Sequence, residues 1–251
     1  IERLIKRAHV AGCSALVVTM ALEILGRRHK DVMKCLSAPP KLTLANMIDM
    51  AMKPRWSLGM LGTKRRSFRN IEGHVDTVED MTSLSKWTAS QFDPSLSWDD
   101  VAWIKERWDR KLIIKGILDE EDARMAAKTG ADAIIVSNHG GRQLDGARSA
   151  LAKLPGIVEA VGDQVEVHMD GGIRSGQDVL KARALGAKGT YIGRAFLYGL
   201  GAMGQAGVTK ALEIIHKEMD ITMALCGCRD IEDFGLEHLI PKEELTANDY
   251  M

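Results

Sequence analysis

The sequence lacks the features that mark several protein classes. It has only four cysteines among 251 residues, too few and too scattered for a disulfide scaffold. No apolar run reaches the roughly 18 residues that a membrane span requires. Basic and acidic side chains number 34 each, so no overall field favours nucleic acid. We therefore expect small-molecule partners and no nucleic-acid partner.

The N-terminal and C-terminal segments bear on location and metal binding. Residues 1–7 are typical of an amphipathic helix rather than of a signal peptide, so we expect a cytoplasmic protein.

Cys226 and Cys228 flank a single glycine. This spacing lacks the two-residue spacer of familiar metal and redox pairs and has no partner cluster, so we expect no metal site.

Short β-branched apolar runs alternate with helical segments along the chain. This alternation predicts βα units around a parallel sheet whose strands are buried on both faces. The expected strands cover residues 13–19, 112–115, 133–137, 165–169 and 190–192. The expected helices are one that ends at Gly12 and those at residues 119–129, 177–185 and 212–225.

Five strands are too few for a closed (β/α)8 barrel, which needs eight. We interpret the chain as about the last five βα units of a barrel, within a single domain of residues 1–251.

A long insertion at about residues 31–98 separates the first two units, where connections usually have about two to six residues. Residues 44–52 inside it are predicted to be helical. Lys64, Arg65 and Arg66 closely follow Trp56, Met60 and Leu61. This cluster is typical of a surface that meets a membrane or an acidic partner, or of a loop that packs on a neighbouring subunit.

Polar residues follow every expected strand, at the end where the loops of a barrel converge on one mouth. The last two strands are followed by glycines, an arginine and a helix start, in the stretches 170–174 and 193–194. Glycine lets backbone amides approach a phosphate, and a helix N-terminus favours an anion. Barrels often bind phosphate after strands seven and eight, which also fits three absent strands.

Five side chains are candidates for the chemistry. His139, beside two glycines at a strand end, is predicted to be the active-site base. Arg28 and Arg142 are suited to clamp a carboxylate, although Arg28 also reads as a surface charge after a turn. Lys115 ends an apolar strand and needs a facing anion, such as a reduced flavin. Asp170 either orients the ring of His139 or binds cofactor hydroxyls.

Three stretches closely resemble the FMN-dependent 2-hydroxy-acid oxidase and dehydrogenase family. They are residues 137–145 (SNHGGRQLD), 170–176 (DGGIRSG) and 192–195 (IGRA). The resemblance extends over nearly the whole chain. Residues 25–31, 36–40 and 115–118 are most similar to bacterial L-lactate dehydrogenases linked to cytochromes or quinones.

The resemblance implies a TIM barrel of the FMN-linked, phosphate-binding type that oxidises an L-2-hydroxy acid, most simply L-lactate, to the 2-oxo acid. It implies that His139 acts as the base and that Arg28 and Arg142 bind the substrate carboxylate. Lys115 would face the N1 region of the flavin and assist catalysis. The remaining implied FMN contacts are Thr19 and Ser137 at the ring, Asp170 and Gly171 near the ribityl chain, and Gly172, Arg174, Gly193 and Arg194 at the phosphate.

The resemblance also implies partners and exposes differences. The electron acceptor would be a quinone, a cytochrome or oxygen, the assembly a homotetramer, and the location cytoplasmic or peripheral on the inner membrane face.

The first three strands of the family fold have no counterpart here, and Ala21 stands where the family has an aspartate that steadies the imidazolium of the active-site histidine, here His139. The alternatives are an oxygen-using oxidase, a truncated flavin-binding or interaction module without turnover, and an FMN-dependent isomerase.

Overall fold

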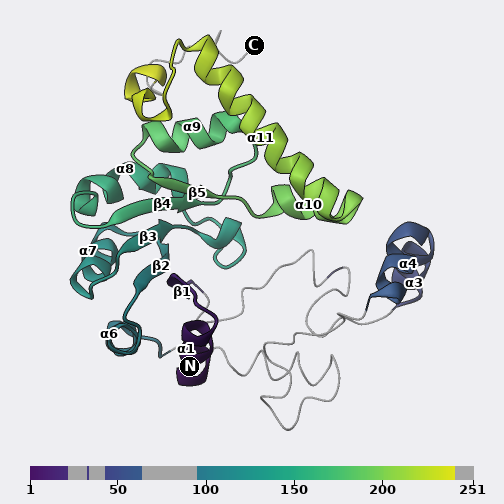
Figure 1. The fold of residues 1–251 in the computed structure, drawn as a ribbon, viewed down its shortest axis with the longest axis horizontal. Coiled ribbons are helices and arrows are strands. Elements are labelled where there is room, and N and C mark those ends of the chain that lie inside the picture. Colours follow the sequence, from purple (N-terminus) through teal and green to yellow (C-terminus); the bar gives the residue numbers. More distant parts are fainter. Residues whose placement is uncertain (22–32, 34–42, 64–94, 241–251) are drawn as a thin grey trace. The chain divides into compact units, whose positions relative to one another are not determined.

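The structure is a computed structural model that describes residues 1–21, 33, 43–63 and 95–240 (Figure 1). The chain divides into two compact units, Ile1–Ala21 with Leu96–Met251, and Leu22–Ser95. The first unit holds a sheet, and residues 43–63 of the second form two short helices; each unit is described by itself. The single domain of residues 1–251 stays a prediction. Arg28 lies outside the described residues.

A five-stranded parallel sheet forms the centre of the first unit. The strand order is β1-β2-β3-β4-β5, so each strand pairs with its neighbours along the chain. The five expected strands are confirmed, with ends shifted by one or two residues. They are β1 (Ala15–Thr19), β2 (Lys111–Ile117), β3 (Ala133–Val136), β4 (Glu166–Asp170) and β5 (Gly189–Tyr191).

Helices separate the strands along the chain and bury one face of the sheet (Figure 1). They are α1 (Glu2–Val10), α6 (Trp98–Arg107), α7 (Glu120–Lys128), α8 (Ala150–Val161) and α9 (Gly176–Ala184). The C-terminal part adds α10 (Arg194–Met203), α11 (Gln205–Leu225) and the short 3-10 helices η2 (Ile231–Asp233) and η3 (Leu236–His238).

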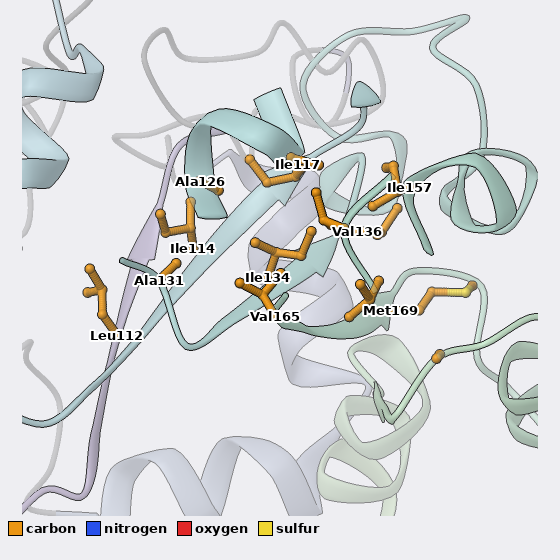
Figure 2. Close-up of a cluster of buried hydrophobic side chains, with 14 of the residues drawn as sticks. Leu112, Ile114, Ile117, Ala126, Ala131, Ile134, Val136, Ile157, Val165 and Met169 are labelled. Carbon is orange, nitrogen blue, oxygen red and sulfur yellow. The ribbon is translucent and has the colours of Figure 1, made fainter. Parts of the chain in front are cut away.

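The alternation of side chains along the strands gives the sheet two different faces. Leu112 and Ile114 of β2, and Ile134 and Val136 of β3, are fully buried. Figure 2 shows them in one cluster with Ile157 of α8. Burying each such side chain stabilises the fold by about 1.5–3 kcal/mol. The strand residues between them point to the other face, which leads to the polar strand ends.

Strand β2 contains a bulge near its C-terminal end. The register with β3 shifts between Lys115 and Ile117, because Gly116 adopts a φ of +109°. Lys115 points away from the core because it alternates with buried Ile114, and the shift at Gly116 allows Ile117 to be buried in the core again. A Cβ on residue 116 would lie 2.9 Å from the backbone nitrogen of Ala21, so a side chain there would collide with the chain after β1.

Four helices were not expected from the sequence, and α8 shows why. Pro155 and Gly156 lie in its middle and are poor helix formers. The helix forms nevertheless, because Ser149 caps it and Leu154 is completely buried. Gly156 permits close packing on α7, since a Cβ there would lie 2.7 Å from the carboxylate of Glu120. Tertiary packing therefore overrides the local preference.

The helix expected at residues 212–225 is longer than the sequence indicates. It begins at Gln205 and is preceded by α10, so the expected N-terminal boundary was wrong. The two helices cross where Gly199 faces Gly207. A Cβ on Gly199 would lie 2.3 Å from the carbonyl oxygen of Gly207, so the crossing depends on two residues without side chains.

The second unit contains α3 (Leu44–Ala51) and α4 (Pro54–Gly62). The helix expected at residues 44–52 is confirmed, and α4 was not expected. Within the described ranges, every helix falls short of the length and apolar character that crossing a membrane requires.

Asp132 fixes the end of the sheet at which the strands begin. Its carboxylate accepts hydrogen bonds from Lys111 at 2.7 Å, the Leu112 N–H at 2.9 Å and Lys105 at 3.3 Å. Burial opposes ionisation, but these three donors outweigh it and lower the pKa of Asp132 from 3.8 to about 2. The ionised carboxylate therefore joins the starts of β2 and β3 to α6.

We expect Asp132→Asn to lower the free energy of unfolding at pH 7 by about 2 kcal/mol. A lowered pKa stabilises the fold above pH 3.8, and this contribution is lost as the pH falls to about 2. Urea unfolding at pH 7 and pH 2.5 measures the effect, with exposed Asp163→Asn as the control. An Asp132→Asn deficit of equal size at both pH values would contradict this role.

Candidate functional site

Residues from the C-terminal parts of β2, β4 and β5 and from the segments that follow β3, β4 and β5 line a pocket at the C-terminal edge of the sheet. Its volume is about 330 Å³. Lys115 comes from the end of β2, Asp170 from the end of β4, and Tyr191 from the end of β5. The other lining residues are His139, Gly140, Arg142, Gly171, Gly172, Ile173, Arg174, Gly193, Arg194, Ala195 and Leu197. The polar residues at or after the ends of β2, β3, β4 and β5 therefore converge as expected, whereas Thr19 at the end of β1 does not line the pocket.

A network of three side chains forms one wall of the pocket. Lys115 Nζ lies 2.7 Å from Asp170 Oδ2, and each side chain is 19% exposed. Ser137, which follows β3, has no exposed surface; it accepts a hydrogen bond from Lys115 and donates one to Asp170, both 3.0 Å long. We expected an anion to face Lys115, and in the structure this anion is Asp170. Ser137 forms a hydrogen bond with each member of the ion pair.

His139 is held in an unusual backbone conformation beside this network. Its φ is +56°, the only positive φ among non-glycine residues of the described ranges. It opens the 3-10 helix η1 (His139–Gly141), which Asn138 caps by accepting a 3.2 Å hydrogen bond from the Gly141 N–H. The His139 N–H donates to Ser137 Oγ at 3.1 Å. Such a conformation costs about 1–3 kcal/mol and is commonly found at functional sites.

Two glycine-containing loops, after β4 and after β5, also line the pocket. Gly171 and Gly172 have φ values of +104° and +86°, which other residues rarely adopt. Arg174 follows them, and its N–H donates to Asp178 in the first turn of α9. The second loop leads into α10, whose first turn has no side-chain cap. An uncapped N-terminus beside arginines is suited to bind an anion.

Arg194 connects the second loop to the histidine loop. Its guanidinium donates to the carbonyl oxygen of Gly140 at 3.3 Å. Arg194 is exposed at the start of α10 and lines the pocket together with Arg174. Two cations therefore lie on the wall that carries the uncapped helix end.

Tyr191 lines the pocket and was missed by the sequence reasoning. It is paired with Asp170 in the β4–β5 register, so both side chains point to the same face. Its hydroxyl lies 3.0 Å from His168 Nδ1, and His168 Nε2 lies 3.2 Å from Glu166. Burial, followed by the charges of Asp170 and Glu166, raises the pKa of Tyr191. The period-two alternation of β5 is the signal that places it there.

The structure brings most of the predicted site residues together. The pocket is lined by nine of them, namely Lys115, His139, Arg142, Asp170, Gly171, Gly172, Arg174, Gly193 and Arg194. Ser137 lies behind the wall and supports it. Thr19 ends β1 and pairs with Lys115 in the sheet, but it is not among the lining residues. The position of Arg28 lies outside the described residues.

A parallel α/β sheet with two glycine loops, arginines and a histidine at its C-terminal edge is the arrangement typical of phosphate-binding barrel enzymes. A family model described as FMN-dependent dehydrogenase matches residues 1–241. The chain belongs to the FMN-dependent dehydrogenase family.

Individual relatives agree with this assignment. An L-lactate dehydrogenase of Caulobacter vibrioides is 44% identical over 230 residues, which are 91% of this chain and 60% of that protein. An L-lactate dehydrogenase of Acinetobacter baylyi is 41% identical over 246 residues, 97% of this chain and 64% of that protein. The chain therefore spans about three-fifths of the length of these curated relatives.

Solved structures show the same relationship in three dimensions. A structure of (S)-mandelate dehydrogenase, described as a monotopic membrane protein, matches 95% of this chain and 63% of its own length, with a TM-score of 0.89 and 33% identity. A mandelate oxidase matches 92% of this chain and 56% of its own length, with a TM-score of 0.67 and 37% identity. The fold is thus part of an FMN-linked (β/α)8 barrel, with five parallel strands present.

The residues of the pocket fit FMN, the cofactor of this family. The uncapped start of α10, with Arg174 and Arg194 nearby, suits the phosphate. Gly171 and Gly172 present backbone without side chains to the pocket. Lys115, fixed by Asp170 and Ser137, offers a positive charge to the ring.

We expect Arg174→Ala and Arg194→Ala each to weaken FMN binding about 10- to 100-fold, because a hydrogen bond to a charged group contributes about 1.5–3 kcal/mol. Binding of riboflavin, which lacks the phosphate, should change little. Quenching of flavin fluorescence measures both affinities, and Arg148→Ala, an exposed arginine outside the pocket lining, is the control. Equal weakening for FMN and riboflavin would contradict a phosphate role.

Proposed function

We propose that the chain carries the catalytic site of an FMN-dependent L-2-hydroxy-acid dehydrogenase, which oxidises L-lactate to pyruvate. The observation that carries this proposal is the position of His139 on the pocket wall, in a strained conformation that Ser137 and two glycines maintain. Support also comes from relatives named L-lactate dehydrogenase at 41–44% identity. An acceptor (a quinone, a cytochrome or oxygen) reoxidises the flavin in this proposal.

In this mechanism the substrate carboxylate is bound by Arg142, together with Arg28. Arg142 lies three residues after His139 in the same pocket, so the carboxylate and the reacting hydroxyl carbon reach adjacent positions. His139 accepts one proton from the substrate as the C–OH group becomes C=O. FMN, when bound, would supply the chemistry of accepting the two electrons together with the second hydrogen of the substrate.

Lys115 and Asp170 have separate roles in this proposal. Lys115 presents a fixed positive charge to the pocket, which favours negative charge developing on the reduced ring. Asp170 and Ser137 hold its ammonium group at 2.7 and 3.0 Å. Because both charges are already paired and positioned, little rearrangement is required during the reaction.

We also propose a location and an assembly. Association with a membrane surface on its cytoplasmic side is supported by the solved relative described as a monotopic membrane protein. Formation of a homo-oligomer is supported by α10, none of whose residues is buried. Its exposed apolar side chains are Leu197, Tyr198, Leu200 and Met203.

Anaerobic addition of L-lactate to the FMN-loaded chain tests the catalytic proposal. The visible absorption of the flavin should bleach, and His139→Ala should slow bleaching about 10²- to 10⁴-fold, the usual contribution of a positioned base. His216→Ala, an exposed histidine on α11, should leave the rate unchanged. Retained flavin that L-lactate never bleaches would contradict the proposal and favour a flavin-binding module without turnover.

Ala21 gives a second test of the same site. It follows β1 by two residues and lies next to Gly116. If a carboxylate at this position steadies the protonated imidazole of His139, Ala21→Asp should increase the rate of flavin reduction by L-lactate. Stopped-flow absorbance measures the rate, and Ala202→Asp on exposed α10 is the control. An unchanged or lower rate with intact flavin binding would show that the chain does not need this carboxylate.

A further inference from the structure

Three polar side chains lead from the pocket along one face of the sheet. They are Tyr191 of β5 with His168 and Glu166 of β4, which we call the polar row. The Tyr191 hydroxyl lies 3.0 Å from His168 Nδ1, and His168 Nε2 lies 3.2 Å from Glu166 Oε2. Tyr191 lines the pocket, whereas the side chain of Glu166 is 68% exposed at the start of β4. The polar row therefore joins the pocket to solvent over the roughly 13 Å that five strand residues span.

The alternation and register of the strands align the polar row. Glu166, His168 and Asp170 occupy every second position of β4, so their side chains point to the face away from the apolar core. Asp170 pairs with Tyr191, and His168 pairs with Gly189. A Cβ on residue 189 would lie 3.3 Å from His168 Nδ1, so a side chain there would crowd the imidazole. The glycine thus leaves room for the ring of His168 to reach the hydroxyl of Tyr191.

The middle of the polar row is shielded from water. The side chain of His168 is 14% exposed. Its register partner on β3 is Ile135, which is 1% exposed and carries no charge, and its partner on β5 is Gly189. A sheltered imidazole with a polar partner on each ring nitrogen exchanges protons with those partners more readily than with bulk water. Proton shuttling of this kind is a common role of histidine.

Charged groups lie at both ends of the polar row. At the pocket end, burial and then the charges of Asp170 and Glu166 raise the pKa of Tyr191, so the phenol keeps its proton at neutral pH. At the other end, Asp132 and to a smaller extent Glu166 raise the pKa of Lys111. Glu166 is therefore close to the charged cluster at the start of the strands, where an exposed carboxylate can pass a proton to solvent.

The chemistry of the three groups sets the direction of their hydrogen bonds. A carboxylate has only acceptor oxygens, so Glu166 accepts from the Nε2–H of His168. The other nitrogen of a neutral imidazole is then an acceptor, and the Tyr191 O–H donates to it. When a proton from the pocket reaches the Tyr191 oxygen, the phenolic proton moves to Nδ1 and the Nε2 proton moves to Glu166. Each new bond to hydrogen replaces a broken one, and the net change is one proton moved from the pocket to Glu166.

We propose that Tyr191, His168 and Glu166 form a proton relay between the FMN pocket and solvent. The relay deepens the proposed function and rests on FMN occupying this pocket. Protons must leave the pocket in each catalytic cycle, because oxidation of the hydroxy acid and reoxidation of the reduced flavin both release them. The relay carries them to the end of the sheet where the strands begin, away from the cation of Lys115.

Reoxidation of bound flavin tests the relay without L-lactate. The full chain is loaded with FMN, reduced anaerobically with dithionite, freed of excess reductant and mixed with ferricyanide in weak buffer that contains a pH-indicator dye. Each anionic reduced flavin gives two electrons to two ferricyanide ions and releases one proton. In wild type the dye signal should follow the return of flavin absorption. Tyr191→Phe, His168→Gln and Glu166→Gln should each slow the dye signal at least about tenfold, because each removes one step of proton transfer.

Matched controls separate proton transfer from structural damage. Tyr198→Phe on α10 and His216→Gln on α11, both exposed, should release the proton at the wild-type rate. Added imidazole, a small proton carrier, should restore the rate in His168→Gln, whereas a structural defect would persist. An unchanged dye signal in the three relay variants with FMN retained, or slowing that imidazole does not relieve, would overturn the relay. Flavin bleaching by L-lactate, measured on the same samples, shows separately whether the catalytic proposal holds.

The protonation of His168 gives a second test that needs no FMN. Nitrogen NMR of the histidine-labelled chain at mildly alkaline pH distinguishes the two neutral tautomers, and His168→Gln assigns the signal. We expect the proton on Nε2, with Nδ1 accepting from Tyr191. A proton on Nδ1 would overturn the relay, because Tyr191 would then accept a hydrogen bond from the ring and could not pass its own proton to it.

Discussion

Lys115 lies near the end of β2 and Asp170 ends β4. These strands lie on either side of β3, and the two side chains meet 2.7 Å apart across its end. A partly buried ion pair of this kind is stable only when the remaining hydrogen-bonding capacity is satisfied. Ser137, fully buried directly after β3, bonds to both partners. These contacts join three adjacent strands at the edge where the pocket opens. They also fix the position of the Lys115 ammonium group before any ligand binds.

The rest of the site depends on the contacts among Lys115, Ser137 and Asp170. Ser137 also accepts the backbone N–H of His139, so the strained histidine loop is attached to the same hydroxyl. Arg194 extends the connection from that loop to the start of α10. The imidazole of His139, the cation of Lys115 and the uncapped start of α10 are thereby placed in one pocket by a few hydrogen bonds. The polar residues of the pocket are therefore confined to the C-terminal edge of the sheet, while the opposite face remains an apolar core.

The sequence was sufficient for the five strands and for the edge at which the site lies, because buried parallel strands are short apolar runs and their polar ends are conspicuous. It did not predict α8, where Pro155 and Gly156 oppose a helix that core packing and the Ser149 cap stabilise. Nor could it predict that Asp170 pairs with Lys115, since that contact depends on the register of β2, β3 and β4. Tyr191 was missed although the alternation of β5 contained the signal.

The central claim is that Lys115 presents a positive charge to FMN in this pocket, and the reduction potential of the bound flavin tests it most directly. The potential should be measured for wild type and for Lys115→Met by equilibration with reference dyes. We expect the variant to be lower by at least about 30 mV, which for a two-electron couple corresponds to about 1.4 kcal/mol. Equal potentials in two proteins that both retain FMN would contradict the account, because the cation would then lie away from the ring.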